Sequence, residues 1–396
     1  MIEGRDWDSG GARLRYGLVG GGAGSFIAGV HRIAIDMTRS ADLVAGCFSR
    51  DKGKNATAAR GLGVASDRNY ASFAEMAERE AAREDGIDFA VVATPNSTHY
   101  AACLAFLSHG IHVSCDKPLC FTVDEALHLA RTAQGKGLFF MVTYVYTGYP
   151  LVRHARELVR NGQLGDIRVV MAEYPQDWLA DRVEDRGNLQ AQWRTDPAQA
   201  GVSCCVGDIG THIENMVHFV TGLEIEKISA TLSTFVEGRL LDDNAMIAVK
   251  YENGALGHYW PSQVAVGREN GLAFRIYGTE ASLEWEQENP NVLRFTRKGH
   301  SPMILTRGGP GLGSAAARWT RLPSGHPEGL FAAWANIYEA YCNCLKNGIQ
   351  GKTCDESDLF PTASDGARGV KFVHDCVESS RLNSAWVDGR PPVVQK

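Results

Sequence analysis

A glycine-rich turn between an apolar stretch and a helical stretch constrains the fold of this chain more than any other segment. Residues 14–19 are mostly apolar, residues 20–24 read Gly-Gly-Gly-Ala-Gly, and the helical stretch runs from Ser25 to about Met37. That order lets backbone N–H groups and a helix N-terminus face a pyrophosphate without side chains in the way. The spacing Gly20-x-Gly22-x-x-Ser25 has serine where a dinucleotide-binding fingerprint has Gly or Ala, so a plain tight turn is the alternative.

Length and composition describe an ordinary two-domain globular protein. The 396 residues are long for one domain, and 44% hydrophobic with 22% charged residues is typical of globular chains. A net charge of −6 argues against a nucleic-acid or anionic-membrane partner, and no apolar run is long enough to span a bilayer. The ten cysteines show no C-x-x-C pair, which predicts reduced thiols, no disulfide and no metal site. We therefore expect a cytoplasmic protein whose residues 1–12 are a disordered tail or an expression-tag remnant.

Strands and helices alternate regularly through the first 148 residues. Helical stretches separate apolar runs at residues 14–19, 42–48, 87–93, 111–115 and 138–144. Such alternation predicts an α/β fold with a doubly wound parallel sheet, so we expect residues 13–148 to form a Rossmann dinucleotide-binding domain. In an open parallel sheet the ligand binds at the carboxyl ends of the strands.

The residues that follow the second strand bear on the choice between NAD and NADP. A carboxylate at this position accepts from the ribose 2′-OH and repels a 2′-phosphate. Here the strand ends at Phe48 and Ser49 with Arg50 beside them, and Asp51 is one residue further on, still within reach of a ribose. The hydroxyl and the guanidinium favour NADP over NAD by a small margin.

Two further strand ends carry candidate site residues. Pro95 halts the third strand and puts Asn96 and His99 at its carboxyl end, and the fourth strand ends in Asp116-Lys117-Pro118. Lys117 has a fixed backbone at the same sheet edge as the glycine loop, which suits a chemical role. The alternative is a solvated surface lysine, as most lysines are.

From residue 149 the pattern changes to long β runs, which predicts an α+β domain over residues 149–390 with a large, open, mostly antiparallel sheet. Turn sequences such as Glu252-Asn253-Gly254 join neighbouring runs, which lie at residues 167–174, 225–235, 244–251, 255–261, 272–278 and 281–286. Residues 299–325 are rich in Gly, Pro and Ser, and we expect them to form a long surface loop that serves as a lid or a partner contact.

Asp208 and His212 are the candidate acid–base pair of this second half. They lie four residues apart at the start of a helix, so they share one helical face if the helix has begun by Asp208. A carboxylate beside an imidazole holds the ring in one tautomer and supports its cation, which a general base for an alcohol needs. A helix-start aspartate followed by a packed histidine is the structural alternative.

These stretches together resemble the Gfo/Idh/MocA oxidoreductases over about residues 14–390. The motifs appear in the family's order, namely the glycine loop at 20–25, Thr94-Pro95-Asn96-x-x-His99, Asp116-Lys117-Pro118 and Gly207-Asp208-x-Gly-Thr-His212. Two positions depart from the family pattern: Asp116 replaces the more usual Glu, and Ser25 replaces the third glycine. The resemblance implies a Rossmann domain and an α+β domain with the active site between them, and homodimer or homotetramer contacts through the open sheet.

The resemblance also implies hydride transfer between a secondary alcohol of a sugar, inositol or glycoside and an NAD(P) cofactor. His212 would take the hydroxyl proton, Asp208 would orient His212, and Lys117 would hydrogen-bond the same oxygen. The residues implied for the cofactor are Gly20, Gly22, Ala23, Gly24, Ser25, Phe26, Ser49, Arg50, Thr94, Pro95, Asn96, His99, Asp116 and Lys117.

A pocket for a polyol needs aromatic faces for C–H surfaces and polar groups for hydroxyls. The candidates for substrate contact are Tyr146, Arg153, Tyr174, Gln176, Trp178, Trp193, Arg194, Asn244 and His326. Roughly half of such aromatic residues are expected to be core instead. Two other functions compete: an NAD-retaining enzyme that cleaves glycosides by transient oxidation, and a non-catalytic dinucleotide or sugar sensor. A sensor has no need for the intact Lys117, Asp208 and His212 set.

Overall fold

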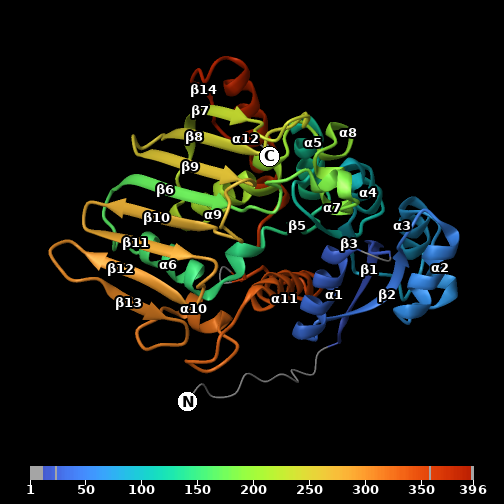
Figure 1. Cartoon of the computed structure of the whole chain (residues 1–396). Helices are drawn as coiled ribbons and strands as arrows, with labels where there is room; N and C mark the ends of the chain where they lie inside the picture. Colours follow the sequence, from blue (N-terminus) through green and yellow to red (C-terminus); the bar gives the residue numbers. More distant parts are fainter. Residues whose placement is uncertain (1–11, 23–24, 356–357, 394–396) are drawn as a thin grey trace. The chain divides into compact units, whose positions relative to one another are not determined.

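The computed structural model describes residues 12–22, 25–355 and 358–393, which form two compact units. Unit 1 contains the chain up to residue 148 together with residues 330–366, and unit 2 contains residues 149–329 with 367–393. The domains predicted from the sequence, 13–148 and 149–390, differ from these units in one segment. Residues 330–366 fall in the second predicted domain but belong to unit 1 in the structure. Figure 1 shows the elements of both units coloured along the chain.

Unit 1 is built on a parallel sheet that has, among the described residues, five strands in the order β2-β1-β3-β4-β5. Every residue of β3 is buried, as expected for a strand covered on both faces. The five predicted strands and the doubly wound fold are confirmed. The elements in chain order are β1 (Leu14–Gly20), α1 (Phe26–Thr38), β2 (Ala41–Cys47), α2 (Lys52–Gly61), η1 (Ser66–Arg68), α3 (Phe73–Ala81), β3 (Phe89–Ala93), η2 (Asn96–Thr98), α4 (His99–Ser108), β4 (His112–Cys115), α5 (Val123–Gly135), β5 (Phe140–Val142) and η3 (Val145–Gly148).

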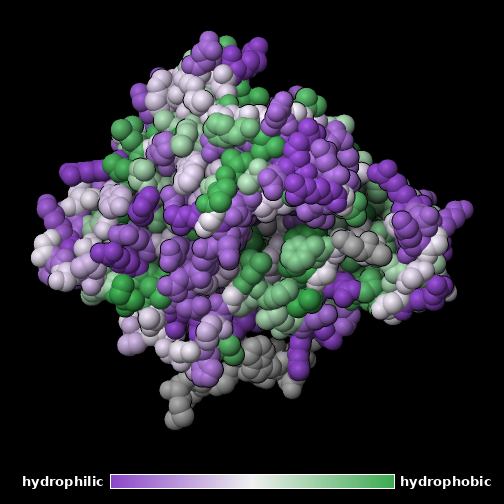
Figure 2. All heavy atoms as spheres, in the orientation of Figure 1, coloured by the Kyte–Doolittle hydropathy of each residue, from purple (hydrophilic) through white to green (hydrophobic). Residues whose placement is uncertain are grey.

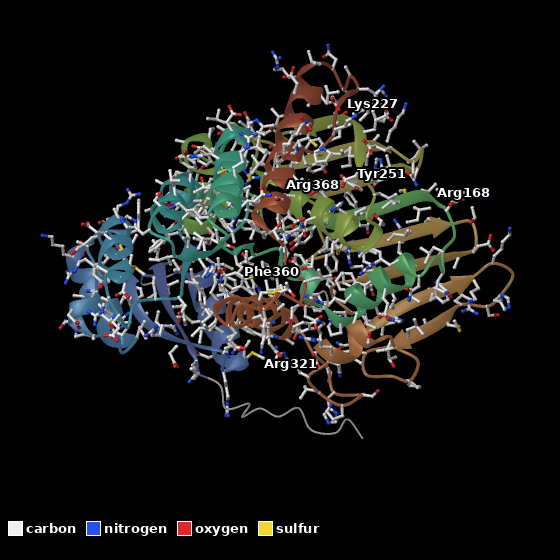
Figure 3. All side chains as sticks on the ribbon, turned by 180° about the vertical axis from the view of Figure 1, so that it is seen from behind. Arg168, Lys227, Tyr251, Arg321, Phe360 and Arg368 are labelled. Carbon is white, nitrogen blue, oxygen red and sulfur yellow. A yellow bond between two sulfur atoms is a disulfide. The ribbon has the colours of Figure 1, made fainter. Side chains whose placement is uncertain are left out.

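The helix α11 (Leu330–Ile349) returns to unit 1 from far along the chain. It packs against α1 and η3 through buried aromatic and amide side chains. Asn336 Nδ2 donates to the carbonyl of Gly148 at 2.9 Å. The ring of Tyr341 meets the ring of Phe360 edge to face, with centroids 5.2 Å apart (Figure 3). These contacts explain why residues 330–366 belong with the parallel sheet.

Unit 2 is built on a large, mostly antiparallel sheet. Within the part of the chain that the structure describes, it has nine strands in the order β13-β12-β11-β10-β6-β9-β8-β7-β14, and only the β6–β9 pair is parallel. The elements are α6 (Pro150–Arg160), β6 (Ile167–Pro175), η4 (Val183–Arg186), α7 (Leu189–Arg194), α8 (Pro197–Ala200), η5 (Val206–Gly210), α9 (Thr211–Thr221), β7 (Ile225–Ser233), β8 (Asn244–Tyr251), β9 (Leu256–Ser262), β10 (Ala273–Gly278), β11 (Ala281–Glu286), β12 (Val292–Arg297), β13 (Met303–Thr306), α10 (Ser314–Trp319), α12 (Ala363–Arg381) and β14 (Val387–Asp388).

The prediction of a long loop over residues 299–325 is wrong. The strand β13 and the helix α10 lie within it, and β13 pairs with β12 from Met303 to Thr306. The apolar run Met303-Ile304-Leu305 extends the sheet by one edge strand, a signal that the surrounding Gly, Pro and Ser residues obscured. The same sheet also gains β12 and β14, which sequence patterning missed.

Helices cover one face of this sheet. The helix α9 contacts β6 and packs against α6, and α10 packs on α6. Near the other end of the sheet, Arg368 of α12 pairs with Glu224, which precedes β7 (Figure 3). Buried Tyr251 of β8 hydrogen-bonds Tyr259 of β9 through their hydroxyls at 2.5 Å. The core of unit 2 therefore lies between the sheet and these helices.

The cysteines differ in one place from the expectation of reduced thiols. A disulfide joins Cys344 of α11 to Cys354, whose Cα atoms are 4.8 Å apart, so the prediction of no disulfide is wrong. The chain turns back after α11 and brings together two cysteines whose spacing carried no signal. Elsewhere burial raises the pKa of the Cys115, Cys204 and Cys376 thiols well above its usual range. None of the described helices is long and apolar enough to cross a membrane.

Candidate active site

The glycine loop of unit 1 has a backbone that side chains would obstruct. Gly20 and Gly21 have φ angles of +93° and +89°, which L-residues rarely adopt. A Cβ on Gly20 would lie 2.4 Å from the carbonyl oxygen of Ala93, and one on Gly22 would lie 3.0 Å from that of Phe48. The loop therefore runs close to the ends of β2 and β3, as a dinucleotide-binding loop requires.

The helix α1 begins directly after this loop. Ser25 is its N-cap residue, with extended backbone, and its N–H donates to the carbonyl of Gly22 at 3.0 Å. Phe26, the first helical residue, is 70% exposed. Ala23 and Gly24, predicted to bind the cofactor, lie outside the described residues. The hydrogen bond from the Ser25 N–H to Gly22 shows that serine is compatible with a tight junction between loop and helix. The loop fits a pyrophosphate at the N-terminus of α1.

The end of β2 presents polar groups of both signs. The Ser49 hydroxyl accepts from the N–H of Asp51 at 3.2 Å, and Asp51 caps α2 by accepting from the N–H of Lys54 at 2.8 Å. Arg50 between them is exposed. A carboxylate thus stands two residues beyond Ser49, close to the strand end at which dinucleotide domains bind the ribose.

His99 ties together two of the predicted strand-end loops. Its Nδ1 lies 3.0 Å from the carbonyl oxygen of Pro118, and its Nε2 lies 2.8 Å from that of Thr94. The hydroxyl of Thr98 donates to that of Thr94 at 2.7 Å, which fixes the same loop. Thr94, His99 and Pro118 are thus brought together at the carboxyl ends of β3 and β4.

Asp116 belongs to a buried network that also involves α1 and α11. Thr143 donates to its carboxylate at 2.7 Å, and His31 Nε2 lies 3.9 Å away. His31 Nδ1 in turn hydrogen-bonds the hydroxyl of Tyr338, which also contacts Ser114 at 3.1 Å. Burial alone would raise the pKa of Asp116, but the interactions with His31 and Thr143 outweigh it and hold that pKa well below its usual range. An ionised Asp116 therefore anchors the backbone from which half-buried Lys117 extends.

In unit 2, Asp208 lies in a π-helical turn, η5, that continues into α9. The sequence predicted an α-helical start here, whereas π turns close i→i+5 hydrogen bonds and occur frequently at functional sites. A Cβ on Gly210 would lie 3.0 Å from Val206 Cγ1, so glycine suits this crowded turn. The side chains of Asp208 and His212 are largely buried, with Asp208 14% exposed.

Two donors bind the Asp208 carboxylate. Arg194 Nε lies 3.1 Å from Oδ2, and Gln263 Nε2 donates to the same oxygen at 2.9 Å. The guanidinium of Arg194 stacks on Trp193, 4.1 Å from the ring centroid, and stands 5.7 Å from that of Trp178. The sequence proposed Arg194 for substrate contact, and the structure gives it a carboxylate partner.

Further predicted residues join this group through Tyr174 and Gln176. The Tyr174 ring lies 6.1 Å from the ring of His212. The hydroxyl of Tyr174 and the amide of Gln176 both donate to Asn270 Oδ1, at 2.7 and 2.8 Å. Gln176 Oε1 accepts from the indole N–H of Trp178 at 3.1 Å. Figure 2 shows hydrophilic side chains gathered where Figure 1 draws α7 and α8, the segment that carries Arg194.

Four of the predicted substrate residues have other surroundings. Arg153 is buried, with its guanidinium 4.8 Å from the ring centroid of Trp319. Asn244 Oδ1 accepts from the indole of Trp260 at 3.0 Å. His326 is exposed, and its N–H donates to Pro323 at 3.3 Å; Tyr146 is buried in η3 of unit 1.

Gln263, Asn270 and Asp242 are polar residues of this region that sequence analysis missed. Asp242 accepts from the N–H groups of Cys204 and Val206, each at 3.0 Å, and so holds the start of the π turn. These residues lie in loops 34 or more positions beyond Asp208, and no local pattern connects them to it. The acidic pair Asp242-Asp243 just before a strand was the one available signal.

Comparison with known proteins places this geometry in a family. One family model, described as an oxidoreductase family with an NAD-binding Rossmann fold, matches residues 14–144, and another, the GFO/IDH/MocA C-terminal domain, matches residues 152–284. YfiI, an uncharacterized oxidoreductase of Bacillus subtilis, is 35% identical over 95% of this chain and 96% of its own length. The chain belongs to the Gfo/Idh/MocA oxidoreductase family. The predicted resemblance is thereby confirmed.

Several Gfo/Idh/MocA relatives are dehydrogenases. Levoglucosan dehydrogenase of Pseudarthrobacter phenanthrenivorans is 28% identical over 75% of this chain and 78% of its own length. The structure of an inositol dehydrogenase homolog from Azotobacter vinelandii, complexed with NAD+, has a TM-score of 0.91 and 38% identity, covering 95% of this chain and 97% of that one. The protein is an NAD-binding oxidoreductase of the sugar or inositol dehydrogenase type. The slight preference for NADP over NAD that we predicted from the end of β2 finds no support. The family model and the structure of the Azotobacter homolog both name NAD.

Proposed function

We propose that this Gfo/Idh/MocA enzyme oxidises a ring hydroxyl of a cyclic polyol, an inositol or a sugar, with His212 as the general base. The observation that carries the proposal is the grouping in unit 2 of His212 with aromatic Tyr174 and of Asp208 with Arg194, whose guanidinium stands beside Trp178. Aromatic faces pack on C–H surfaces, and the polar groups bind hydroxyls. The Azotobacter homolog has also been solved with NADH and myo-inositol, at 37% identity and a TM-score of 0.88, which supports a cyclitol as the first candidate.

The residues of unit 2 handle the proton of the reacting alcohol. Bound NAD+ supplies the hydride acceptor, C4 of the nicotinamide. His212 takes the hydroxyl proton and becomes an imidazolium, and the Asp208 carboxylate, four residues earlier, stabilises that cation. In the direction of reduction His212 returns the proton.

The residues of unit 1 hold the cofactor and polarise the alcohol oxygen. The glycine loop and the start of α1 bind the pyrophosphate. Lys117 donates a hydrogen bond to the reacting oxygen and stabilises the negative charge that develops as the proton leaves. Asp116, fixed by Thr143 and His31, holds the backbone of Lys117 in place.

A substrate screen with a base-deficient variant tests this proposal. The purified protein, supplied with NAD+, is incubated with inositols, pyranoses and 1,6-anhydrosugars while absorbance in the reduced-nicotinamide band is followed. We expect NADH from at least one cyclic polyol. His212→Ala should lower turnover by on the order of 10²–10⁴, because proton transfer to a positioned base contributes that much.

The control is a second histidine of the same helix. His218 Nδ1 lies 3.1 Å from the carbonyl oxygen of Leu223, where it serves the end of α9, so His218→Gln should leave turnover within about twofold. NAD+ affinity, measured by calorimetry, should survive in both variants. Unchanged turnover in His212→Ala would remove His212 as the base. Cleavage of a glycoside without net NADH would instead favour the NAD-retaining glycoside-cleaving function.

A further inference from the structure

We propose that Gln263 and Arg194 are positioning residues that together fix the orientation and the charge of the Asp208 carboxylate. The inference rests on the proposed function, in which Asp208 serves His212. It assigns a role to Gln263, which no sequence pattern pointed to, and moves Arg194 from substrate contact to support of the acid–base pair.

Both donors bind one carboxylate oxygen. Arg194 Nε and Gln263 Nε2 approach Oδ2 of Asp208 at 3.1 and 2.9 Å. Two donors on one oxygen, arriving from α7 and from the residue that follows β9, determine the plane of the carboxylate.

Arg194 is held independently of Asp208. Its guanidinium stacks on the Trp193 ring at 4.1 Å, and its Nη1 donates to the backbone carbonyl and to the side-chain oxygen of Gln190, at 3.2 and 2.8 Å. The side chain is 21% exposed, so its interaction with Asp208 is only partly screened by water. Arg194 is therefore preorganised toward the carboxylate.

The orientation of the Gln263 amide is also determined. Gln263 is fully buried, its backbone N–H donates to the carbonyl of Asp243 at 2.8 Å, and its Oε1 accepts from the thiol of Cys204 at 3.4 Å. With Oε1 engaged by a donor, the NH₂ group must point to Asp208. The Asp208 N–H donates to the carbonyl of the same Cys204 at 2.8 Å, so Cys204 couples the amide to the π turn.

The charged and titratable groups around Asp208 come from several elements. Arg194 of α7 brings a positive charge, and buried Asp242, which holds the turn through Cys204 and Val206, brings an acidic group. The thiols of Cys204 and Cys205 stay neutral, because burial raises their pKa well above its usual range. Titratable His212 lies in the first turn of α9, which follows the π turn directly. In this setting the Arg194 charge and the Gln263 hydrogen bond both favour ionised Asp208.

Two variants change one donor each. Gln263→Glu keeps the size of the side chain and puts a second carboxyl group beside Asp208, where two acids share one proton. Arg194→Lys keeps a positive charge. It loses the Nε donor to Asp208 and the planar guanidinium whose Nη1 hydrogen-bonds Gln190. Gln192→Glu and Arg186→Gln are the matched controls, since both residues are exposed on the same segment of unit 2.

The readout is the pH dependence of kcat/KM for NADH formation, together with carbon-13 NMR titration of labelled aspartate carboxyls, assigned with Asp208→Asn. In Gln263→Glu we expect two midpoints to move together to higher pH by about one unit or more. One is the midpoint at which kcat/KM falls on the acid side of its pH profile, and the other is the midpoint of the Asp208 NMR titration. Activity below the first midpoint should fall about tenfold per unit and recover in alkaline buffer. Arg194→Lys should move both in the same direction by less, and the controls should move neither.

The NMR titration separates failure of this inference from failure of the proposed function. If no polyol is oxidised, the Asp208 resonance still reports whether Gln263 and Arg194 control its ionisation. A lower unfolding temperature with an unchanged titration in both variants would reduce the two residues to structural roles and overturn the inference. If Gln263→Glu does not fold, the Arg194→Lys titration decides alone.

Discussion

Asp51 has a structural role at the start of α2, and we propose that it also selects the cofactor. Its carboxylate caps α2 by accepting from the N–H of Lys54, and its own N–H is held by the hydroxyl of Ser49. Our prediction of the cofactor from the sequence gave more weight to Ser49 and Arg50 than to Asp51, because they lie at the end of the strand. If the Asp51 carboxylate faces the ribose, it should repel a 2′-phosphate, which would agree with the NAD named by the family model.

Asp51→Asn separates the two roles of this side chain. Asparagine caps helices about as well as aspartate, so the free energy of unfolding should change by less than about 0.5 kcal/mol. Removal of the negative charge should strengthen NADP binding by up to about tenfold while NAD binding changes little. Calorimetric titration of both dinucleotides measures this. Asp67→Asn, an exposed acid in η1, is the control, and an unchanged NADP affinity would remove Asp51 from cofactor selection.

Residues of the site differ in how far the sequence could predict them. Gly20 and Gly22 were recognisable from the local glycine pattern, and the structure requires glycine at Gly20 for its positive φ and at Gly22 for its close approach to Phe48. Asp208 and His212 were proposed from a local four-residue spacing. Gln263 was not, because its meeting with Asp208 depends on how β9 ends next to the π turn. Long-range partners of a site residue carry no signature in a single sequence.

At the level of elements, α11 joins the cofactor unit from far along the chain and packs against α1 and η3. Its buried face brings Tyr338 to His31 of α1 and to Ser114 of β4. Burial raises the pKa of the Tyr338 hydroxyl well above its usual range, so it remains a neutral hydrogen-bonding group. The apolar periodicity of such a helix does not reveal which sheet it covers.

Tyr338→Phe removes the hydroxyl between His31 and Ser114 and leaves both buried groups without it. Loss of a buried hydrogen-bond partner costs about 1–3 kcal/mol, which should appear as a lower free energy of unfolding in urea. The control is Tyr341→Phe on the same helix, whose hydroxyl makes a long 3.4 Å hydrogen bond to Phe139 and should cost about 1 kcal/mol or less. Equal losses in the two variants would contradict a special role for Tyr338.

For the whole molecule, the order of strands, helices and turns along the sequence was enough to predict two sheets of different kinds. The parallel sheet follows from repeated strand–helix units, and the second sheet follows from β runs joined by turns. The path of the chain between the units was not predictable. Residues 330–366 cross back to unit 1, and only tertiary contacts such as the Asn336 hydrogen bond to Gly148 record that return.

Hydrogen exchange in increasing urea tests this division of the chain. Cooperative units lose protection together, so amides of α11 should open with β1 and β3 and not with β6 or β9. NAD+ at about 100 times its dissociation constant should stabilise the unit that binds it by about 2.7 kcal/mol, and α11 should share that gain. Sheet amides of unit 2 serve as the internal control. Opening of α11 together with β6 would instead restore the boundary at residue 149 that the sequence predicts.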